Sequence, residues 1–444
     1  MKKIIIIGAG PAGLGAALRL KELGVKDFTV LEKNPYAGGL CASFKDLRGF
    51  TWDLGGHVIF SHFPEFTKAF EGALDGNLLE HDRICRIRIM DRWIPYPFQN
   101  NIATLPEKDA LFCLEELKKA PGAKAPSANF KEWILNTMGR GIAEYFMLPY
   151  NFKVWAHPPQ MLSKDWLAER VAPVSYEDVF QRFKTNAPEM NWGPNARFKY
   201  PRSGGTGAIF LALAREVKNN ILYNKEATEI NADRKTVTLS SGDTLPYDFI
   251  ISTAPLDTLV SSLRPRNPAL ADAAKELLYN GVFSIGVGVS GPVPDNKCWM
   301  YFPENNTPPY RVTYLSNYSP EIAPDGKHHA MLCEVSHSAH KPENADTIAQ
   351  ETVNGLARCG MLPDKNKVVS LDVRNIERAY PIPSLGRDAA LKTILPRLER
   401  LGIFSRGRFG AWRYEAGNTD HCFMQGRQAA DRIISGTEEQ VWKN

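Results

Sequence analysis

The sequence predicts an α/β protein in which a mixed α/β domain is combined with an inserted helical domain and an antiparallel β-sheet domain. Residues 2–31 contain an apolar strand, a helical pattern and a second apolar strand, which is a βαβ opening. Residues 103–190 carry helical patterns with few glycines, whereas residues 281–380 contain several strand-like runs. The 444-residue chain is also longer than one hydrophobic core usually supports.

The βαβ opening has the glycine spacing of a Rossmann-type unit. Residues 2–7 are predicted as a strand, residues 11–23 as a helix that ends at Gly24, and residues 28–31 as a second strand. Between the first strand and the helix stands Gly8-Ala9-Gly10-Pro11-Ala12-Gly13. In this pattern the glycines allow a tight turn, close approach of a pyrophosphate to the main chain, and close packing of helix on strand. We therefore expect a bound dinucleotide here.

Residues after the second strand favour FAD over NAD. Glu32 follows Gly13 by 19 residues, where a carboxylate accepts hydrogen bonds from the adenosine ribose hydroxyls. Gly38-Gly39-Leu40 comes just beyond Glu32 and Lys33, and a second glycine pair at this place is typical of flavoproteins. Thr253-Ala254-Pro255 after a predicted strand is another flavoprotein-like feature. Each feature is weak alone, because Gly-Gly is a common turn, but together they predict a Rossmann-type FAD-binding domain.

The remaining elements determine where the domains are expected to divide. Ser241-Gly242-Asp243 is predicted as a turn between the strands at 236–239 and 249–252, and the last helix is expected to begin at about Gln425. Helices are further expected at 109–119, 130–138 and 142–147, and strands at 227–231, 283–289, 299–302, 310–315 and 331–335.

These elements predict three domains, two of which are built from separated segments. The expected division is an FAD-binding Rossmann-type domain of residues 1–80, 201–260 and 396–444, a helical domain of residues 97–190, and a β-sheet substrate domain of residues 81–96, 191–200 and 261–395.

Composition and charge argue against several classes of protein. The net charge of +5 without a block of like charges gives no reason to expect a nucleic-acid partner. Seven scattered cysteines without a Cys-x-x-Cys pair argue against a disulfide framework, and we expect no metal. The lysines before residues 4–7 could imitate a secretory signal, but the glycines that follow assign this segment to a strand. No apolar run approaches the roughly 20 residues that span a bilayer, so we expect no membrane insertion. The cysteine pattern predicts a reducing, cytoplasmic setting.

Four long motifs lie outside the glycine-rich nucleotide-binding pattern. They are Gly55-Gly56-His57-Val58-Ile59-Phe60-Ser61-His62, Pro95-Tyr96-Pro97-Phe98-Gln99-Asn100-Asn101, Pro149-Tyr150-Asn151-Phe152-Lys153-Val154-Trp155-Ala156 and Trp412-Arg413-Tyr414-Glu415. The sequence contains no Gly-x-Ser-x-Gly elbow and no His-Glu-x-x-His motif that would indicate a different chemistry. With these motifs, from residue 4 to about residue 435, the sequence closely resembles the UDP-galactopyranose mutase family, most nearly its eukaryotic-type branch.

The resemblance implies an isomerase, an intramolecular transferase that interconverts UDP-galactopyranose and UDP-galactofuranose without net oxidation or reduction. It implies that N5 of reduced FAD is the nucleophile at the anomeric carbon of the sugar, and that NADPH or NADH is the reductant. The product would enter a furanose-containing glycan, such as that of a cell wall. No residue in the motifs distinguishes galactose from other sugars, and the oligomeric state is left open.

The same resemblance implies roles for individual residues. Arg170 and Arg311 match the pair that grips the pyrophosphate, a task suited to the fixed donor fork of a guanidinium group. His57 matches a residue on a loop that lies against the flavin and shifts with its redox state. The implied substrate-binding residues are Tyr96, Gln99, Phe146, Asn151, Trp155, Asn195, Tyr301, Tyr380, Tyr414 and Phe60. The implied cofactor-binding residues are Gly8, Gly10, Pro11, Ala12, Gly13, Glu32, Lys33, Gly38, Gly39, Leu40, Gly56, His57, Arg408, Gly417, Asn418 and Asp420.

The sequence departs from the family pattern at one position of the C-terminal motif. Asn418-Thr419-Asp420 stands where the family pattern is Asn-Gln-Asp, which affects the expected flavin contacts.

Three alternative functions remain open. The same ring chemistry on another nucleotide sugar is one alternative function. An amine-oxidase-like flavin oxidoreductase is a second, and a non-catalytic protein that binds FAD or a sugar nucleotide is a third.

Overall fold

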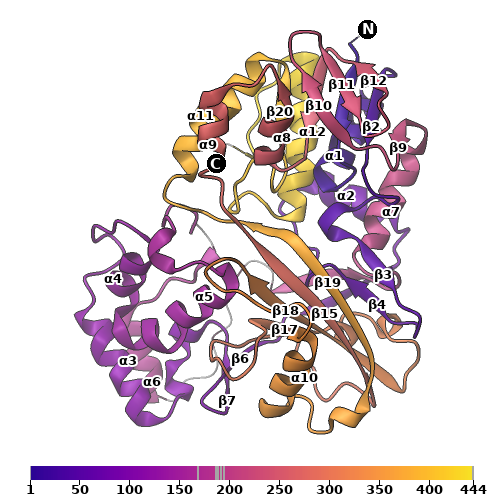
Figure 1. The fold of residues 1–444 in the computed structure, drawn as a ribbon. Helices are drawn as coiled ribbons and strands as arrows, with labels where there is room; N and C mark the ends of the chain where they lie inside the picture. The colour runs from indigo at the N-terminus through magenta and orange to yellow at the C-terminus, as the bar shows by residue number, and fades with distance from the viewer. Residues whose placement is uncertain (1, 168–169, 186–189, 191–192, 194–195, 443–444) are drawn as a thin grey trace.

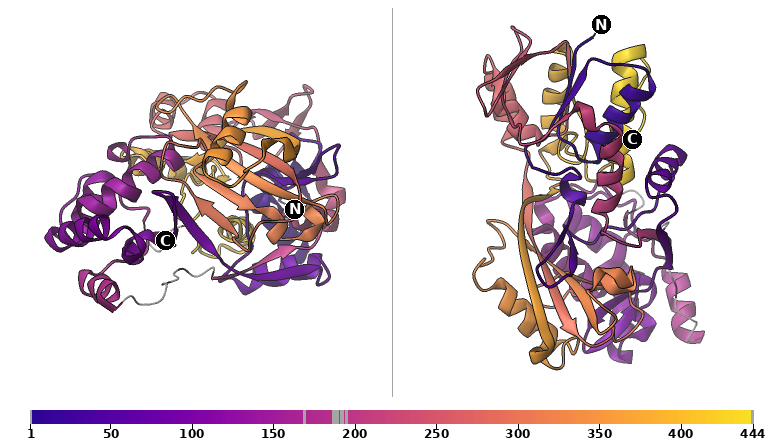
Figure 2. Two further views of the ribbon diagram at one scale, coloured as in Figure 1. Left: turned by 90° about the horizontal axis from the view of Figure 1, so that it is seen from below. Right: turned by 90° about the vertical axis from the view of Figure 1, so that its right-hand side faces the viewer.

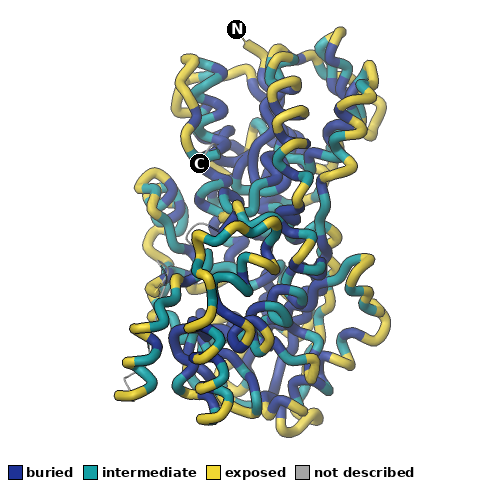
Figure 3. Tube along the Cα trace, turned by 90° about the vertical axis from the view of Figure 1, so that its left-hand side faces the viewer, coloured by how far each residue is buried: buried dark blue, intermediate teal, exposed yellow. Residues whose placement is uncertain are grey.

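The computed structural model describes residues 2–167, 170–185, 190, 193 and 196–442. Two lobes are stacked along the long axis of the molecule (Figure 1). One lobe surrounds a parallel sheet, and the other combines a seven-stranded sheet with a group of helices that lie beside it (Figure 2). In each lobe the buried backbone lies along the central strands, and exposed segments lie on the outer helices and turns (Figure 3).

The first lobe contains a five-stranded sheet whose strand pairs are all parallel. Its central strand β1 is a run of four isoleucines, and alternate side chains point to opposite faces. Ile4 and Ile6 belong to one hydrophobic core and Ile5 and Ile7 to another, so both faces are covered. In spatial order the strands are β20 (Ile403–Ser405), β13 (Phe249–Ser252), β1 (Ile4–Ile7), β2 (Phe28–Leu31) and β9 (Ile221–Leu222).

Helices pack on each face of this sheet through these two cores. On the face of Ile4 and Ile6 lie α1 (Pro11–Glu22), α2 (Pro64–Ala73), α7 (Gly207–Glu216) and α12 (Thr419–Ser435). On the other face lie α8 (Leu256–Ser262), α9 (Pro268–Ala274), α11 (Arg387–Arg400) and a small sheet of β12 (Thr244–Pro246), β11 (Thr236–Leu239), β10 (Ala227–Asn231) and β14 (Leu263–Arg264).

The second lobe is organised by a seven-stranded sheet whose pairs are antiparallel except for β16 with β6. Helix α10 (Ile348–Arg358) packs on one face, and aromatic side chains from the hairpin of β3 (Ser43–Lys45) and β4 (Thr51–Asp53) pack on the other. Gly286 and Gly288 make room for them, because a Cβ at these positions would meet the rings of Trp52 and Phe50. The strand order is β19 (Val368–Pro381), β15 (Tyr279–Ser290), β18 (His328–His337), β17 (Arg311–Tyr314), β16 (Trp299–Tyr301), β6 (Cys85–Ile89) and β7 (Arg92–Pro95).

A group of helices lies beside this sheet (Figure 1). Gly139 and Gly141 of α4 allow close contact with α3, since a Cβ on Gly139 would lie 2.3 Å from the carbonyl oxygen of Glu116. After α4 the chain forms a π-helical turn (Ala143–Met147) and continues into α5, and such turns are frequent at functional sites. The helices are α3 (Glu107–Lys119), α4 (Phe130–Ile142), α5 (Leu148–Trp155) and α6 (Tyr176–Thr185).

Two local predictions differ from the structure. Helix α12 begins at Thr419, six residues before the expected Gln425, because Thr419, Asp420 and His421 already form its first turn. The turn at Ser241–Asp243 joins β11 to the short strand β12, which the sequence prediction omitted. Two further strand pairs are present, β5 (Leu78–Asp82) with β8 (Arg197–Pro201) and β3 (Ser43–Lys45) with β4 (Thr51–Asp53).

Candidate active site

A cavity of about 1570 Å³ extends from the loop between β1 and α1 to helix α5. Its walls come from both lobes, so segments far apart in the sequence meet in one space. Asn195 lies outside the described residues. All the other predicted site residues line this cavity except Gly13 and Gly38, which stand behind its wall.

The β1–α1 loop has the geometry of a phosphate cradle. Gly8 has a φ of +99°, which L side chains rarely adopt, and its Cβ would lie 2.2 Å from Thr253 Oγ1. A Cβ on Gly13 would lie 1.8 Å from the carbonyl oxygen of Gly8. At Gly10 the nearest atom to an added Cβ is 3.8 Å away, so the loop stays open toward the cavity and the N-terminus of α1. A helix N-terminus beside an open glycine loop binds phosphate groups.

Replacing Gly13 with alanine is therefore expected to abolish FAD binding, because the new Cβ would overlap the Gly8 carbonyl and move the cradle. Gly72→Ala in helix α2 is the matched control, since nothing lies within 4 Å of its added Cβ. In a helix, alanine is more favourable than glycine by roughly 0.5–1 kcal/mol. Flavin absorbance after purification and thermal unfolding measure both effects. A yellow Gly13→Ala protein with the normal flavin content would contradict this reading.

Glu32 lies at one end of the cradle. It directly follows β2, is 4% exposed, and its Oε2 accepts a hydrogen bond of 2.8 Å from the amide of Ala9. Its Oε1 accepts from the backbone and side-chain nitrogens of Asn34. A carboxylate has about four acceptor sites, so Glu32 can fix the glycine loop and still accept from ribose hydroxyls. These features fit FAD, as the glycine pattern predicts.

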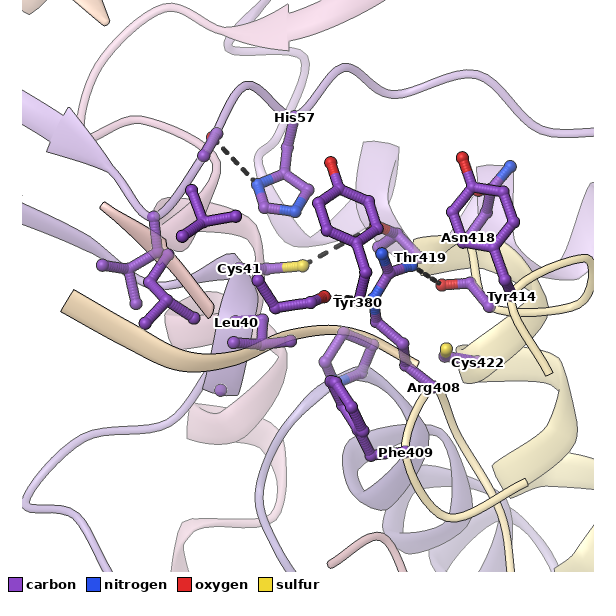
Figure 4. Close-up of a pocket in the computed structure, with 18 of the residues that line it drawn as sticks. Leu40, Cys41, His57, Tyr380, Arg408, Phe409, Tyr414, Asn418, Thr419 and Cys422 are labelled. Carbon is purple, nitrogen blue, oxygen red and sulfur yellow. Dashed lines mark hydrogen bonds between the residues drawn. The ribbon is translucent and has the colours of Figure 1, made fainter. Parts of the chain in front are cut away.

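The middle of the cavity is shown in Figure 4. Leu40 and Cys41 approach from the second glycine loop, and Asn418 and Thr419 stand at the N-terminus of α12. Cys41 Sγ lies 3.6 Å from Thr419 Oγ1, so the unexpected threonine is in contact with the glycine loop. Burial raises the pKa of Cys41 to about 12, which keeps the thiol neutral.

The Arg408 side chain also lies in the middle of the cavity wall. Its Nε donates to the carbonyl of Ala379 at 3.0 Å and its Nη1 to that of Gly417 at 3.0 Å (Figure 4). The guanidinium group also lies over the ring of Tyr380 at 4.8 Å. These contacts fix a permanent positive charge in the cavity wall beside the α12 N-terminus, where both favour negative charge on a bound group.

His57 lies on the loop after β4, opposite these residues in Figure 4. Its Nδ1 is 3.1 Å from the carbonyl oxygen of Gly55. Because a carbonyl only accepts, Nδ1 carries the proton of the neutral ring and Nε2 remains an acceptor. Burial is the main cause that lowers the pKa of His57. The Asp53 and Glu334 carboxylates act in the opposite direction, and the charges of Arg408 and Arg311 lower it further.

Arg311 is held by a carboxylate that the sequence prediction missed. Arg311 on β17 and Glu334 on β18 face each other in register, and Nη2 donates to Glu334 Oε1 at 2.7 Å while Nε donates to Oε2. Nη2 also lies 3.4 Å from the carbonyl of Gly56. Burial alone would lower the pKa of Arg311, but the Glu334 carboxylate raises it well above its usual value. Glutamate within the apolar strand at 328–337 was a sequence signal for this pair.

Arg170 approaches the cavity from the helical side. Its Nη1 donates to Asn418 Oδ1 at 3.0 Å and its Nη2 to the carbonyl of Glu415 at 2.7 Å. The guanidinium group lies 5.0 Å from the ring centroid of Tyr414. The two arginines predicted as a pair therefore line the same cavity, Arg170 from the helical group and Arg311 from the seven-stranded sheet, and Arg170 here contacts the segment that leads into α12.

Four tyrosines surround the space near Arg311. The hydroxyls of Tyr310 and Tyr380 are 3.1 Å apart, and Tyr310 also lies 3.1 Å from Glu334 Oε1. The Tyr301 hydroxyl accepts a hydrogen bond of 2.7 Å from Trp299. Burial raises the pKa of Tyr301, Tyr310 and Tyr380, so these hydroxyls stay protonated at neutral pH. Tyr310 donates its proton to Glu334, whereas Tyr301 and Tyr380 can donate to a bound anion. Tyr414 and Tyr380 have ring centroids 5.9 Å apart.

The far end of the cavity has aromatic walls. Phe146 is stacked on Tyr150, with ring centroids 4.9 Å apart, and Trp155 packs edge-on against Tyr414 at 4.8 Å. Asn151 donates to the carbonyl of Met147 at 2.7 Å and accepts from Trp155 Nε1 at 3.3 Å. Its amide still has one N–H and further lone pairs free to read a base edge. Tyr96, Gln99 and Phe60 also line the cavity.

Within the described residues, no group of three or more His, Cys, Asp or Glu side chains could hold a metal ion. No helix in that part of the chain is long and apolar enough to cross a membrane.

Comparison with known proteins identifies the family. The family model of flavin-containing amine oxidoreductases matches residues 11–434. A solved structure of reduced UDP-galactopyranose mutase superposes with a TM-score of 0.97 at 43% identity, covering 100% of this chain and 96% of that one. Cyclohexylamine oxidase from Brevibacterium oxydans IH-35A has a TM-score of 0.70 at 14% identity, covering 97% of this chain and 98% of that one, and so shares the fold.

Curated relatives match over shorter segments. The 1-hydroxycarotenoid 3,4-desaturase of Flavobacterium sp. (strain P99-3) is 56% identical over 55 residues, which is 12% of this chain and 11% of the relative. The chain therefore spans only a small part of the length of the first such relatives. The full-length match at 43% identity is more specific. The chain belongs to the flavin-containing amine oxidoreductase family and, within it, to the UDP-galactopyranose mutases.

Proposed function

We propose that this protein is a flavin-dependent isomerase that interconverts UDP-galactopyranose and UDP-galactofuranose. The observation that carries the proposal is the shared wall of Arg170, Arg311 and Tyr301 in a cavity that continues into the glycine cradle. Its aromatic end fits a uridine and its cationic middle fits a diphosphate, which would place the attached sugar beside the flavin. The close similarity to a reduced UDP-galactopyranose mutase supports the same function.

The chain's own residues would bind the diphosphate and stabilise it as it leaves the sugar. When bound and reduced, FAD supplies N5 as the nucleophile at the anomeric carbon. Arg311 keeps a permanent positive charge because Glu334 stabilises it, and Arg170 adds a second one. Protonated Tyr301 and Tyr380 supply neutral donors to the same oxygens. Donors fixed in advance favour the state in which negative charge collects on the diphosphate.

The other predicted residues would orient the substrate and exclude water. We assign Tyr96, Gln99, Phe146, Asn151 and Trp155 to the uridine, and Phe60 and Asn195 to the substrate nearby. We assign the glycines of both loops, Glu32, Lys33, Arg408 and Asp420 to FAD. Further proposals are the division into FAD-binding, helical and β-sheet substrate domains, NADPH or NADH as reductant, a cytoplasmic location, and a product used in a furanose-containing glycan.

A pH profile is expected to report on His57. Because burial lowers its pKa, the folded protein keeps His57 neutral at pH values above that lowered pKa, including those just below the ordinary value for histidine. If the Nε2 lone pair acts on the bound flavin, kcat/KM falls only when the pH drops through the lowered pKa. His57→Asn is expected to remove this acidic limb and to change the reduced-flavin spectrum. An unchanged profile and spectrum would exclude the role.

The direct test is turnover by the reduced holoenzyme. The yellow protein is reduced with dithionite under anaerobic conditions, given UDP-galactofuranose, and the formation of UDP-galactopyranose is followed by chromatography. Conversion without net consumption of reductant is expected, and none in the oxidised control. A reduced protein that converts other nucleotide sugars but not this one would revise the substrate alone. Sustained hydrogen peroxide formation with an oxidised product would instead support an amine-oxidase-like reaction.

A further inference from the structure

Lys153 is a buried lysine that lies behind the cavity wall. It belongs to α5, whose residues Asn151, Val154 and Trp155 line the cavity, whereas Lys153 does not. It is 3% exposed. Burial is the main reason why the pKa of Lys153 is lowered to about 7, and neighbouring Lys341 lowers it further. Burying an amine is costly unless its donors are used.

The donors of Lys153 are used on one particular loop. Nζ donates to the carbonyl oxygen of Glu304 at 2.9 Å and to that of Thr307 at 2.7 Å. Both carbonyls belong to residues 302–310, the loop that joins β16 to β17. Tyr301 stands at the start of this loop, and Arg311 follows its end. One side chain therefore connects the helix at the aromatic end of the cavity with the loop between two anion-binding residues.

A second connection runs from the C-terminal end of α5 to β19. Asn280 on β15 is 1% exposed, and its Nδ2 donates to the carbonyls of Val154 at 2.9 Å and Trp155 at 3.0 Å. Its Oδ1 accepts from the amide of Tyr380 at 3.1 Å. Asn280 therefore hydrogen-bonds the main chain at the C-terminal end of α5 and connects it to β19. Lys153 connects the same helix to the loop at 302–310.

We propose that Lys153 is a positioning residue that sets the spacing between the uridine-binding helix and the diphosphate-binding strands. The proposal rests on the function proposed above, because it takes the two ends of the cavity as subsites of one ligand. A ligand that occupies both subsites depends on their spacing, whereas a ligand that occupies one does not. When the spacing between the subsites is fixed, binding of one part of the ligand holds the other part at a high effective concentration near its own subsite. The whole ligand then binds more tightly than either part alone.

The test compares whole and partial ligands on the oxidised holoenzyme. Titrations with uridine, pyrophosphate and UDP are carried out on the wild type, Lys153→Met and Lys153→Arg. In Lys153→Met the Kd of UDP is expected to rise by about tenfold, while the values for uridine and pyrophosphate change by less than about twofold. Lys153→Arg retains a long cationic donor that can reach both carbonyls and is expected to recover most of the UDP affinity.

Lys297→Met is the matched control. Lys297 is also a lysine of the second lobe, but its partner Asp295 is two residues away in the loop between β15 and β16, and neither side chain lines the cavity. It is expected to leave UDP affinity unchanged. Equal weakening of all three ligands in Lys153→Met, or an unchanged Kd for UDP, would overturn the positioning role. Absence of UDP binding to the wild type would instead contradict the proposed function.

Discussion

Arg311→Lys is expected to lower kcat by on the order of 10²–10³-fold while FAD stays bound. Arg311 uses Nε and Nη2 on the Glu334 carboxylate, which leaves Nη1 of the same rigid fork for a phosphate. A lysine carries a single ammonium group and cannot meet both partners with a fixed geometry. The loss should appear in kcat more than in FAD content, because the arginine stands away from the glycine cradle.

Arg311→Ala would not separate a loss of activity from a loss of folding. Glu334 is 2% exposed, and removing its partner would leave a buried charge unpaired at a cost of about 3–5 kcal/mol. Lost activity in Arg311→Ala could therefore come from loss of folding, whereas lysine keeps a positive charge beside Glu334. Arg88→Lys serves as the control, since Arg88 pairs with Asp91 on the same sheet outside the cavity. Anaerobic turnover, flavin absorbance and thermal unfolding separate the effects, and near-normal kcat in Arg311→Lys would remove the residue from the mechanism.

The link between Arg311 and Glu334 also explains what the sequence could and could not predict. The glycine cradle was predictable because its contacts join residues close in the chain, and Gly8, Gly13 and Glu32 stand in one βαβ unit. Glu334 was not predictable as a partner of Arg311, since their pairing depends on the register of two strands. A one-residue shift of that register would turn Glu334 to the other face of the sheet.

The same difference between local contacts and contacts across the sheet applies to the remaining site residues. The sequence contains 15 tyrosines, and only resemblance to a family singled out Tyr301, Tyr380 and Tyr414. Tyr310, which shares a hydrogen bond with Tyr380, was left out because its role depends on contact across the sheet. The beginning of α12 was also missed, because its first turn contains polar residues that face the cavity instead of an apolar periodic face.

Loss of one buried charge in the last segment of the chain is expected to have the largest effect on stability. The Arg406 and Glu439 side chains are both 0% exposed. Arg406 donates to Glu439 at 2.5 and 2.6 Å and to Glu399 at 2.6 Å, and Arg432 donates to both carboxylates. Replacing Glu439 with methionine leaves two cations facing one anion in the interior. Such a change costs about 3–5 kcal/mol.

The effect should extend to FAD because of where Arg406 stands. The next residue, Gly407, donates its amide to Gln425 of α12 at 2.8 Å, and a Cβ on Gly407 would lie 3.0 Å from Cβ of Ala12. Arg406 therefore holds the segment that packs against the glycine cradle. Glu439→Met is expected to lower the midpoint of thermal unfolding and to release FAD at lower temperature than the wild type.

A double-mutant cycle tests whether the cost comes from the unpaired charge. In Arg406→Met/Glu439→Met the remaining Arg432 and Glu399 still pair at 2.9 Å, so charge balance is restored. The double variant is expected to be more stable than Glu439→Met, because a buried ion pair can be replaced by apolar groups at little cost. Glu216→Gln is the control, since its pair with Lys21 is half-exposed. If the double variant instead loses the sum of the two single losses, packing by these side chains, and not charge, is what stabilises this region.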